Sequence, residues 1–134
     1  METEIKKLSD VFEIEDFIIP DNLHLQKGLA NESFLVFTAK AGDKIVGGLT
    51  AYVLNQYYSE KPLAYIYDLA VLTPYQRKGI GKKLMKSLAE YCGQNGFEEV
   101  YVQAEAVDED AIEFYRATRP TGEENVVHFY YTLN

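Results

Sequence analysis

The stretch "AYIYDLAVLTPYQRKGIGKKL", residues 64–84, decides the fold class. Its first nine residues are apolar on both faces of an extended chain, which predicts a strand in the interior of a sheet. From residue 79 to residue 94 the pattern changes to a helical period. The apolar positions of that period are Ile80, Leu84, Leu88 and Tyr91. A strand, a glycine loop and a helix in this order predict an α/β unit.

The junction between this strand and this helix has the features of an anion site. The first N–H groups of a helix have no intrahelical partners, and they lie at the positive end of the helix dipole. Gly79 and Gly81 allow a phosphate to approach the backbone, and Arg77, Lys78 and Lys82 add positive charge. The segment therefore predicts a polyphosphate site, and a basic turn before a surface helix is the alternative.

Three known phosphate loops were compared with this segment. A Walker A loop requires glycine where the chain has Gln76, and Ser or Thr where it has Lys83. A dinucleotide loop requires a third glycine where the chain has Leu84. The run Gln76-Arg77-Lys78-Gly79-Ile80-Gly81 matches Gln/Arg-x-x-Gly-x-Gly/Ala, and in this it resembles the pyrophosphate loop of the GCN5-related N-acetyltransferases. The resemblance implies that this loop, with Lys82, binds the diphosphate of acetyl-CoA.

The rest of the chain predicts one mixed sheet. Strands are expected at residues 3–8, 33–40, 44–54, 97–106 and 125–133, and helices at residues 9–31, broken near Pro20, and 110–118. The resulting order β-α-β-β-β-α-β-α-β is an α/β (α+β) fold, with a mixed central sheet flanked by helices on both faces. With no long linker, residues 1–134 are expected to form a single acetyltransferase domain.

Composition excludes several classes of protein. Hydrophobic residues make up 47% of the chain, which argues against disorder. No apolar run reaches the roughly 18–20 residues that span a bilayer, and the N-terminus lacks a signal-peptide pattern. The single cysteine, Cys92, permits no internal disulfide and favours a cytoplasmic location. A net charge of −8 argues against nucleic acid as a partner and is compatible with a cationic ligand.

The charge is distributed unevenly. Residues 76–86 carry five positive side chains and no acid, whereas residues 98–113 carry seven acids and no base. This pattern predicts an anion site in the first segment and a cation site in the second. Two solvated surfaces are the alternative.

Further segments resemble the type I aminoglycoside 3-N-acetyltransferases within the same superfamily. They are "GGLTAY", "YIYDLAV", "YVQAE", "AIEFY" and "VVHF", and the similarity extends from about Phe34 to Tyr130. The resemblance implies transfer of an acetyl group from acetyl-CoA to an amine. Direct attack without an acyl-enzyme is expected, because Cys92 lies on the apolar stripe of its helix and no Ser-His pair is evident. It also implies that Leu69, Ala70 and Val71 bind the pantetheine arm through backbone groups.

Asp68 is the first candidate catalytic residue. A carboxylate inside an apolar strand is unusual, and burial would raise its pKa. From spacing alone, an aspartate satisfied by a backbone N–H or a tyrosine hydroxyl is an equal alternative. The resemblance implies that Asp68 accepts the proton of the reacting amine or anchors its ammonium group.

The remaining candidates follow residue 100. By resemblance, Tyr115 protonates the leaving thiolate, although "RATRP" replaces the usual "FYxKxGF" pattern after it, and a core aromatic is the alternative. The acids Glu105, Asp108, Glu109 and Asp110 are expected to bind a cationic acceptor, and an exposed acidic loop is the alternative.

The other reactive residue types predict no chemistry of their own. His24 and His128 have no accompanying ligand set, so no metal site is expected. Cys92 lies on the apolar stripe of its helix and is expected in the core. Two other functions stay open: a binding module that senses acyl-CoA without catalysis, and acetylation of a protein N-terminus or lysine. A homodimer paired through "HFYYTL" is also open.

Overall fold

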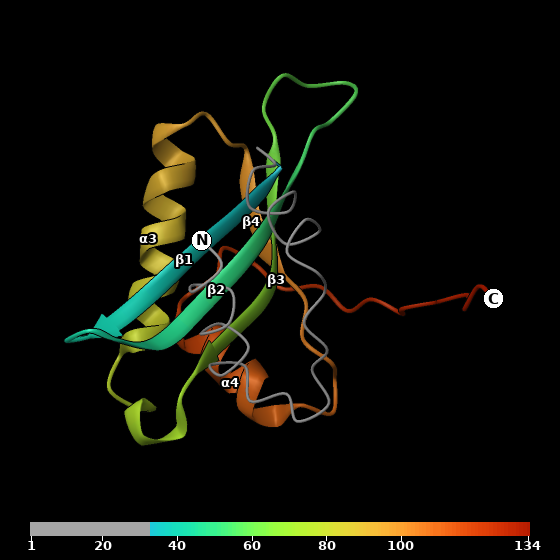
Figure 1. The fold of residues 1–134 in the computed structure, drawn as a ribbon. Coiled ribbons are helices and arrows are strands. Elements are labelled where there is room, and N and C mark those ends of the chain that lie inside the picture. Colours follow the sequence, from blue (N-terminus) through green and yellow to red (C-terminus); the bar gives the residue numbers. More distant parts are fainter. Residues whose placement is uncertain (1–32) are drawn as a thin grey trace. The chain divides into compact units, whose positions relative to one another are not determined.

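A computed structural model describes residues 33–134, which fall into two compact units that divide after Gln103 (Figure 1). The strand and helix predicted within residues 3–31 lie outside the described residues. In the described part of the chain, no helix is long and apolar enough to cross a membrane.

The first unit is a mixed four-stranded sheet with a helix packed against one face (Figure 1). Its elements are β1 (Phe34–Ala41), β2 (Lys44–Leu54), β3 (Leu63–Val71), the 3-10 turn η1 (Thr73–Tyr75), α3 (Ile80–Gln94) and β4 (Glu99–Val102). The strand order is β1-β2-β3-β4; β1 and β3 run antiparallel to β2, and β4 runs parallel to β3. The α/β class and the interior position of the "AYIYDLAVL" strand are confirmed.

Apolar side chains of α3 form the core with the facing strands. Leu84 and Leu88 of α3 pack with Leu49 of β2 and Ile66 of β3, and all four are buried. Cys92 belongs to the same cluster, and burial raises the pKa of its thiol, so it is a core residue as expected. The start of α3 packs closely on β2 at Gly47. A Cβ at this position would lie only 3.1 Å from the Ile80 side chain.

A β-bulge interrupts the pairing of β2 with β3. Thr50 pairs with Asp68 and Ala51 pairs with Ile66, so Tyr67 is the extra residue. The pairing of β3 with β4 covers only Leu63 to Ile66. Among the described residues, no strand therefore pairs with residues 67–71 on the β4 side of β3.

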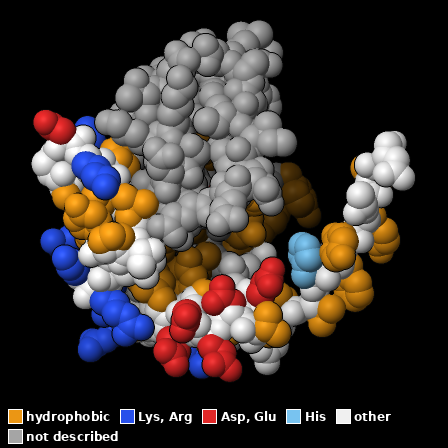
Figure 2. All heavy atoms as spheres, turned by 60° about the horizontal axis from the view of Figure 1, so that its bottom comes forward, with side chains coloured by type: hydrophobic (Ala, Val, Ile, Leu, Met, Phe, Trp, Pro, Cys, Tyr) orange, Lys and Arg blue, Asp and Glu red, His pale blue; other side chains and the backbone are white. Residues whose placement is uncertain are grey.

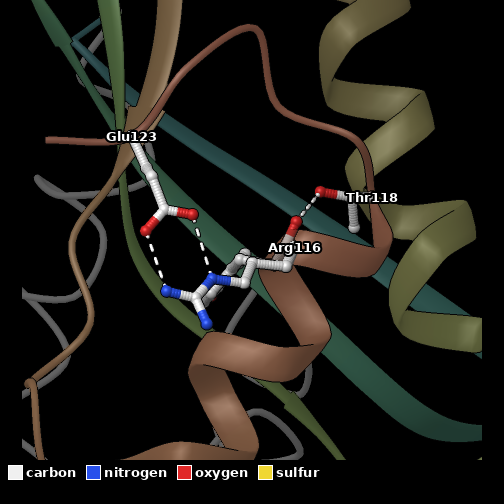
Figure 3. Close-up of polar contacts among 4 residues, drawn as sticks. Arg116, Thr118 and Glu123 are labelled. Atoms are coloured by element: carbon white, nitrogen blue, oxygen red, sulfur yellow. Dashed lines mark hydrogen bonds and ion pairs between the residues drawn. The ribbon is translucent and has the colours of Figure 1, made fainter.

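The second unit, Ala104–Asn134, contains helix α4 (Glu109–Ala117), which agrees with the helix predicted at 110–118. Figure 3 shows how its C-terminal end is held. The Arg116 guanidinium donates two hydrogen bonds of 2.9 Å to the Glu123 carboxylate. The Thr118 hydroxyl donates to the carbonyl of Tyr115 at 2.6 Å.

The strand predicted at residues 125–133 is wrong. These residues have no regular secondary structure and are exposed. Figure 2 shows apolar side chains along this extended segment. A β-strand requires a neighbouring strand for its backbone groups, and within the described residues this segment has none. Its residue types favour a strand, but among residues 33–134 no partner strand satisfies that preference.

Candidate active site

The N-terminus of α3 is left open. Gly79 is its N-cap, in the left-handed region at φ 82°, and no side chain caps the helix. The first turn contains no acid. The first intrahelical bond runs from the Lys83 N–H to the Gly79 carbonyl at 3.1 Å, so in this part of the structure the N–H groups of residues 80–82 precede the helical ladder. Three backbone donors are thus available to an anion.

The loop before α3 is held to the end of β3. The Gln76 side chain donates to the Val71 carbonyl at 2.9 Å, and Lys78 lies 5.6 Å from the centre of the Tyr75 ring. Arg77 is also in the left-handed region, at φ 62°. Non-glycine residues with positive φ are uncommon and cluster at ligand sites. The loop is thus shaped by specific contacts as well as by glycine.

These features fit the diphosphate of coenzyme A. A Cβ on Gly79 would meet nothing within 4 Å, so the space beside the open donors is clear of the described side chains. The basic residues Arg77, Lys78 and Lys82 are exposed around it. Backbone donors, a positive helix end and nearby cations thus lie together, and this combination suits an anion.

The end of β3 beside this loop has an open edge. The Leu72 N–H donates to the Val46 carbonyl of β2 at 2.8 Å. Because successive residues of a strand direct their backbone groups to opposite sides, Ala70 also faces β2, while Leu69 and Val71 face the open edge. Of the three residues predicted to hold a pantetheine arm, two therefore present backbone groups to that edge.

Asp68 lies on this strand, half-buried, on the face opposite α3. Ala51 of β2 packs in the core with α3, so its neighbours Thr50 and Tyr52 lie on the other face of the sheet. Asp68 pairs with Thr50, and Tyr65 pairs with Tyr52, so both lie on that face too. The Asp68 N–H donates to the Thr50 hydroxyl at 3.2 Å. Burial raises the pKa of the Asp68 carboxyl group, and a hydrogen bond with Thr50 partly opposes that rise. A carboxylate with a raised pKa is suited to accept a proton.

A row of aromatic rings crosses the same part of the sheet, and the sequence pattern alone does not reveal it. The Tyr52 ring lies 5.1 Å from Phe34 and 5.5 Å from Tyr67. Tyr65 stacks on Tyr101 at 4.9 Å. Tyr67 is 63% exposed, so one ring next to Asp68 is open to solvent. Cross-strand aromatic pairing is the signal that could have revealed this row, once the strand register was known.

The other predicted residues belong to the second unit. Tyr115 is half-buried, with its ring 5.1 Å from that of Phe114. Asp108 is the N-cap of α4, and its Oδ1 accepts a hydrogen bond from the Ala111 N–H at 3.1 Å. Glu105, Glu109 and Asp110 are exposed, and Figure 2 shows acidic side chains gathered on one face. Asp108 therefore has a structural role, as a helix cap, besides the acceptor binding predicted from the sequence.

Metal ligation finds no support in the described residues, where no group of three His, Cys, Asp or Glu could hold an ion. His128 is exposed, with its ring stacked 6.0 Å from that of Tyr130. His24 lies outside the described residues.

Comparisons with known proteins bear on the family. A family model described as "Acetyltransferase (GNAT) family" matches residues 3–118. The chain is 60% identical to aminoglycoside acetyltransferase meta-AAC0020, from an uncultured soil metagenomic sample, in its complex with sisomicin; the match covers 97% of this chain and 86% of that one, with a TM-score of 0.91. Aminoglycoside acetyltransferase HMB0005, also from a soil metagenomic sample, is 31% identical over 100% of this chain and 90% of that one, with a TM-score of 0.87.

A curated relative is more distant. The chain is 30% identical to N-alpha-acetyltransferase 50 of Danio rerio over 114 residues. The match covers 84% of this chain and 64% of the length of that relative.

Proposed function

The chain belongs to the acetyltransferase (GNAT) family, and on that basis we propose that it transfers an acetyl group from acetyl-CoA to a primary amine of a small cationic acceptor, an aminoglycoside. The observation that carries this proposal is the open N-terminus of α3 next to the strand that holds Asp68. The 60% identity to an enzyme described in complex with sisomicin supports the choice of acceptor.

The loop and the strand end supply the donor site. The N–H groups of residues 80–82 bind the diphosphate, with charge from Arg77, Lys78 and Lys82. The open edge of β3 at Leu69 and Val71 binds the amide groups of the pantetheine arm. When bound, acetyl-CoA supplies the thioester carbonyl that the amine attacks.

Asp68 acts as the general base. An acceptor amine is an ammonium ion at neutral pH and must lose a proton before it can attack a carbonyl. The raised pKa of Asp68 makes its carboxylate a stronger base than an ordinary aspartate, which suits it to accept this proton. Tyr115 donates a proton to the leaving thiolate, in keeping with the resemblance to the superfamily. No acyl-enzyme forms on Cys92, because its side chain is buried in the core.

The acids of the second unit bind the cationic acceptor. Glu105, Asp108 and Glu109 are proposed as its partners, with Asp110 beside them. Each exposed pair contributes little by itself, but several carboxylates together raise the local concentration of a polycation. The net charge of −8 acts in the same direction.

Two other functions remain for comparison. A module that only senses acyl-CoA needs neither Asp68 nor an acidic segment, and the family membership favours an enzyme. Acetylation of a protein N-terminus is favoured by the 30% identity to N-alpha-acetyltransferase 50, but the 60% identity to an aminoglycoside acetyltransferase is higher and covers more of the chain.

We also propose that residues 1–134 form one cytoplasmic domain that assembles as a homodimer. The family match from residue 3 to residue 118 extends over both units, which supports one domain. The exposed segment with Phe129, Tyr130, Tyr131 and Leu133, each at least 77% exposed, supports a partner chain. Light scattering on the full chain is expected to give twice the 15.3 kDa monomer mass, and a monomer at all concentrations would contradict the dimer.

The test of the function is the variant Asp68→Asn. Loss of a general base lowers turnover by about 100-fold or more, while the affinity for acetyl-CoA stays nearly unchanged. Release of free thiol from acetyl-CoA, measured with aminoglycosides, polyamines and peptides, gives the activity. Asp43→Asn, in the exposed turn between β1 and β2, is the matched control and is expected to retain parental activity. Parental turnover in Asp68→Asn would rule out this base.

The pH dependence gives a second measure of Asp68. Since the carboxylate is the active form, kcat/KM rises with pH through the raised pKa of Asp68. Stability changes in the opposite direction. A pKa raised on folding means that the folded state binds more protons, so the free energy of unfolding falls as pH rises from the ordinary aspartate pKa of 3.8 through the folded pKa. In Asp68→Asn this fall is expected to be absent.

A further inference from the structure

Thr50 occupies an unusual place in the sheet. It is 6% exposed, and among the described residues it is the only buried polar side chain. It lies on β2, directly opposite Asp68 on β3. A buried hydroxyl requires hydrogen-bond partners, and here its partner is the residue proposed as the base.

The position of Thr50 beside the bulge explains why a hydroxyl is useful there. The extra residue, Tyr67, disrupts the ladder immediately before Asp68. At that point the Asp68 N–H donates to the Thr50 hydroxyl oxygen, at 3.2 Å. The hydroxyl still has its own proton, because a threonine can accept and donate at the same time. That proton is available to the Asp68 carboxylate.

We propose that Thr50 is a positioning residue for Asp68, in which one hydroxyl accepts the hydrogen bond of the Asp68 N–H and donates its own to the Asp68 carboxylate. This inference rests on the proposed role of Asp68 as the base. The two bonds fix both ends of the residue, its backbone at the bulge and its carboxylate on the face opposite α3.

The same hydroxyl also affects the basicity of Asp68. Burial raises the pKa of the carboxyl group, and the hydrogen bond with Thr50 lowers it again in part. Without the hydroxyl, burial acts unopposed, and a larger fraction of Asp68 is protonated at a given pH. A protonated Asp68 cannot accept the proton of the acceptor amine.

The experiment compares Thr50→Val with Thr50→Ser. Valine keeps the shape of threonine but lacks the hydroxyl, whereas serine keeps the hydroxyl. We expect Thr50→Val to lower kcat/KM at neutral pH roughly tenfold, from the loss of hydrogen bonds to a charged group. In Thr50→Val, the rise of kcat/KM with pH should shift to higher pH. Thr50→Ser should restore the parental pH dependence. Thr38→Val, on β1 and not paired with β3, is the matched control and should leave the pH dependence of kcat/KM unchanged.

Two further measurements separate this role from a merely structural one. Carboxyl carbon NMR titration of Asp68 in the full chain, without any substrate, should show a higher pKa in Thr50→Val than in the parent and in Thr50→Ser. In an Asp68→Asn background, Thr50→Val should have almost no additional effect on kcat/KM. An unchanged Asp68 titration in Thr50→Val, with activity lost equally at all pH values, would overturn the proposal.

The outcomes also distinguish this inference from the proposed function. If Asp68→Asn keeps parental activity, Asp68 is not the base, and any change in rate caused by Thr50→Val cannot arise through it. The NMR titration still decides whether Thr50 holds the carboxylate. If Asp68→Asn is inactive and Thr50→Val titrates like the parent, the base stands and the positioning role of Thr50 is wrong.

Discussion

The N-termini of the two described helices, α3 and α4, are built in opposite ways. Helix α3 begins at Gly79 without a side-chain cap and without an acid in its first turn. Helix α4 begins at Asp108, which caps the Ala111 N–H, and Glu109 and Asp110 follow in its first turn.

The difference separates a helix start that is capped by its own side chains from one that is open to an anion. In α4 the side chains of the helix itself satisfy a free N–H group and neutralise the dipole. In α3 the same backbone groups and the same dipole lack these internal partners, and basic side chains lie around them. The arrangement lowers the stability of α3 at its start, and an external anion can restore it.

The largest expected effect comes from giving α3 the carboxylate that α4 has. Gly79→Asp places a negative charge among the open donors and should weaken acetyl-CoA binding by about a hundredfold, measured by calorimetry. Gly96→Asp is the matched control, since Gly96 also has positive φ, at 75°, and a Cβ there also meets nothing within 4 Å. Equal losses of affinity in both variants would mean that the loss does not come from a charge placed among the open donors of α3.

An intermediate effect is expected from removing the cap of α4. Asp108→Ala should lower the free energy of unfolding by about 1 kcal/mol, measured in urea, while Asp108→Asn should retain most of the stability because asparagine also caps. Affinity for acetyl-CoA should be unchanged in both. If Asp108 also binds the acceptor, Asp108→Asn should raise the KM for a polycationic aminoglycoside at parental stability, and an unchanged KM would leave Asp108 with the capping role alone.

The smallest effect concerns the first-turn charge of α4. Glu109→Gln should lower the free energy of unfolding by about 0.3–1 kcal/mol at low ionic strength, because it removes an anion from the positive end of the dipole. The loss should decrease in about 1 M salt, where charges are screened within about 3 Å. Glu113→Gln, one turn further along the same helix, is the control and should have a smaller effect. A loss that does not respond to salt would contradict the electrostatic explanation.

The sequence predicted the strand–loop–helix unit well, for physical reasons that are local. An apolar run, two glycines and a helical period each favour one conformation wherever they occur, and the family match confirms the superfamily inferred from residues 76–81. The end of the chain shows the limit of such reasoning. Val127, Phe129 and Tyr131 favour a strand, but a strand also needs a neighbour, and residue types do not reveal whether one is present.

The surroundings of Asp68 were less predictable. Simple alternation along "YIYDL" places Tyr65 and Tyr67 on one face and Asp68 on the other, whereas the bulge at Tyr67 puts Asp68 on the same face as Tyr65. Thr50, in "GGLTAY", is of a residue type common in strands, and only the strand register shows that it lies opposite Asp68. A bulge arises from the pairing of two strands, so neither strand reveals it alone.

The hydrogen bond from Gln76 to Val71 has a consequence for the choice of donor molecule. It joins the loop proposed to bind the diphosphate to the strand that carries the proposed base, and Val71 is three residues from Asp68, about 10 Å along a strand. The distance between the proposed diphosphate loop and Asp68 is thus set by the backbone of β3. In the proposed mechanism, a thioester on a shorter or longer arm would be held by its phosphates with its carbonyl beyond the reach of the amine, so the proposal entails selection of the donor by length as well as by charge.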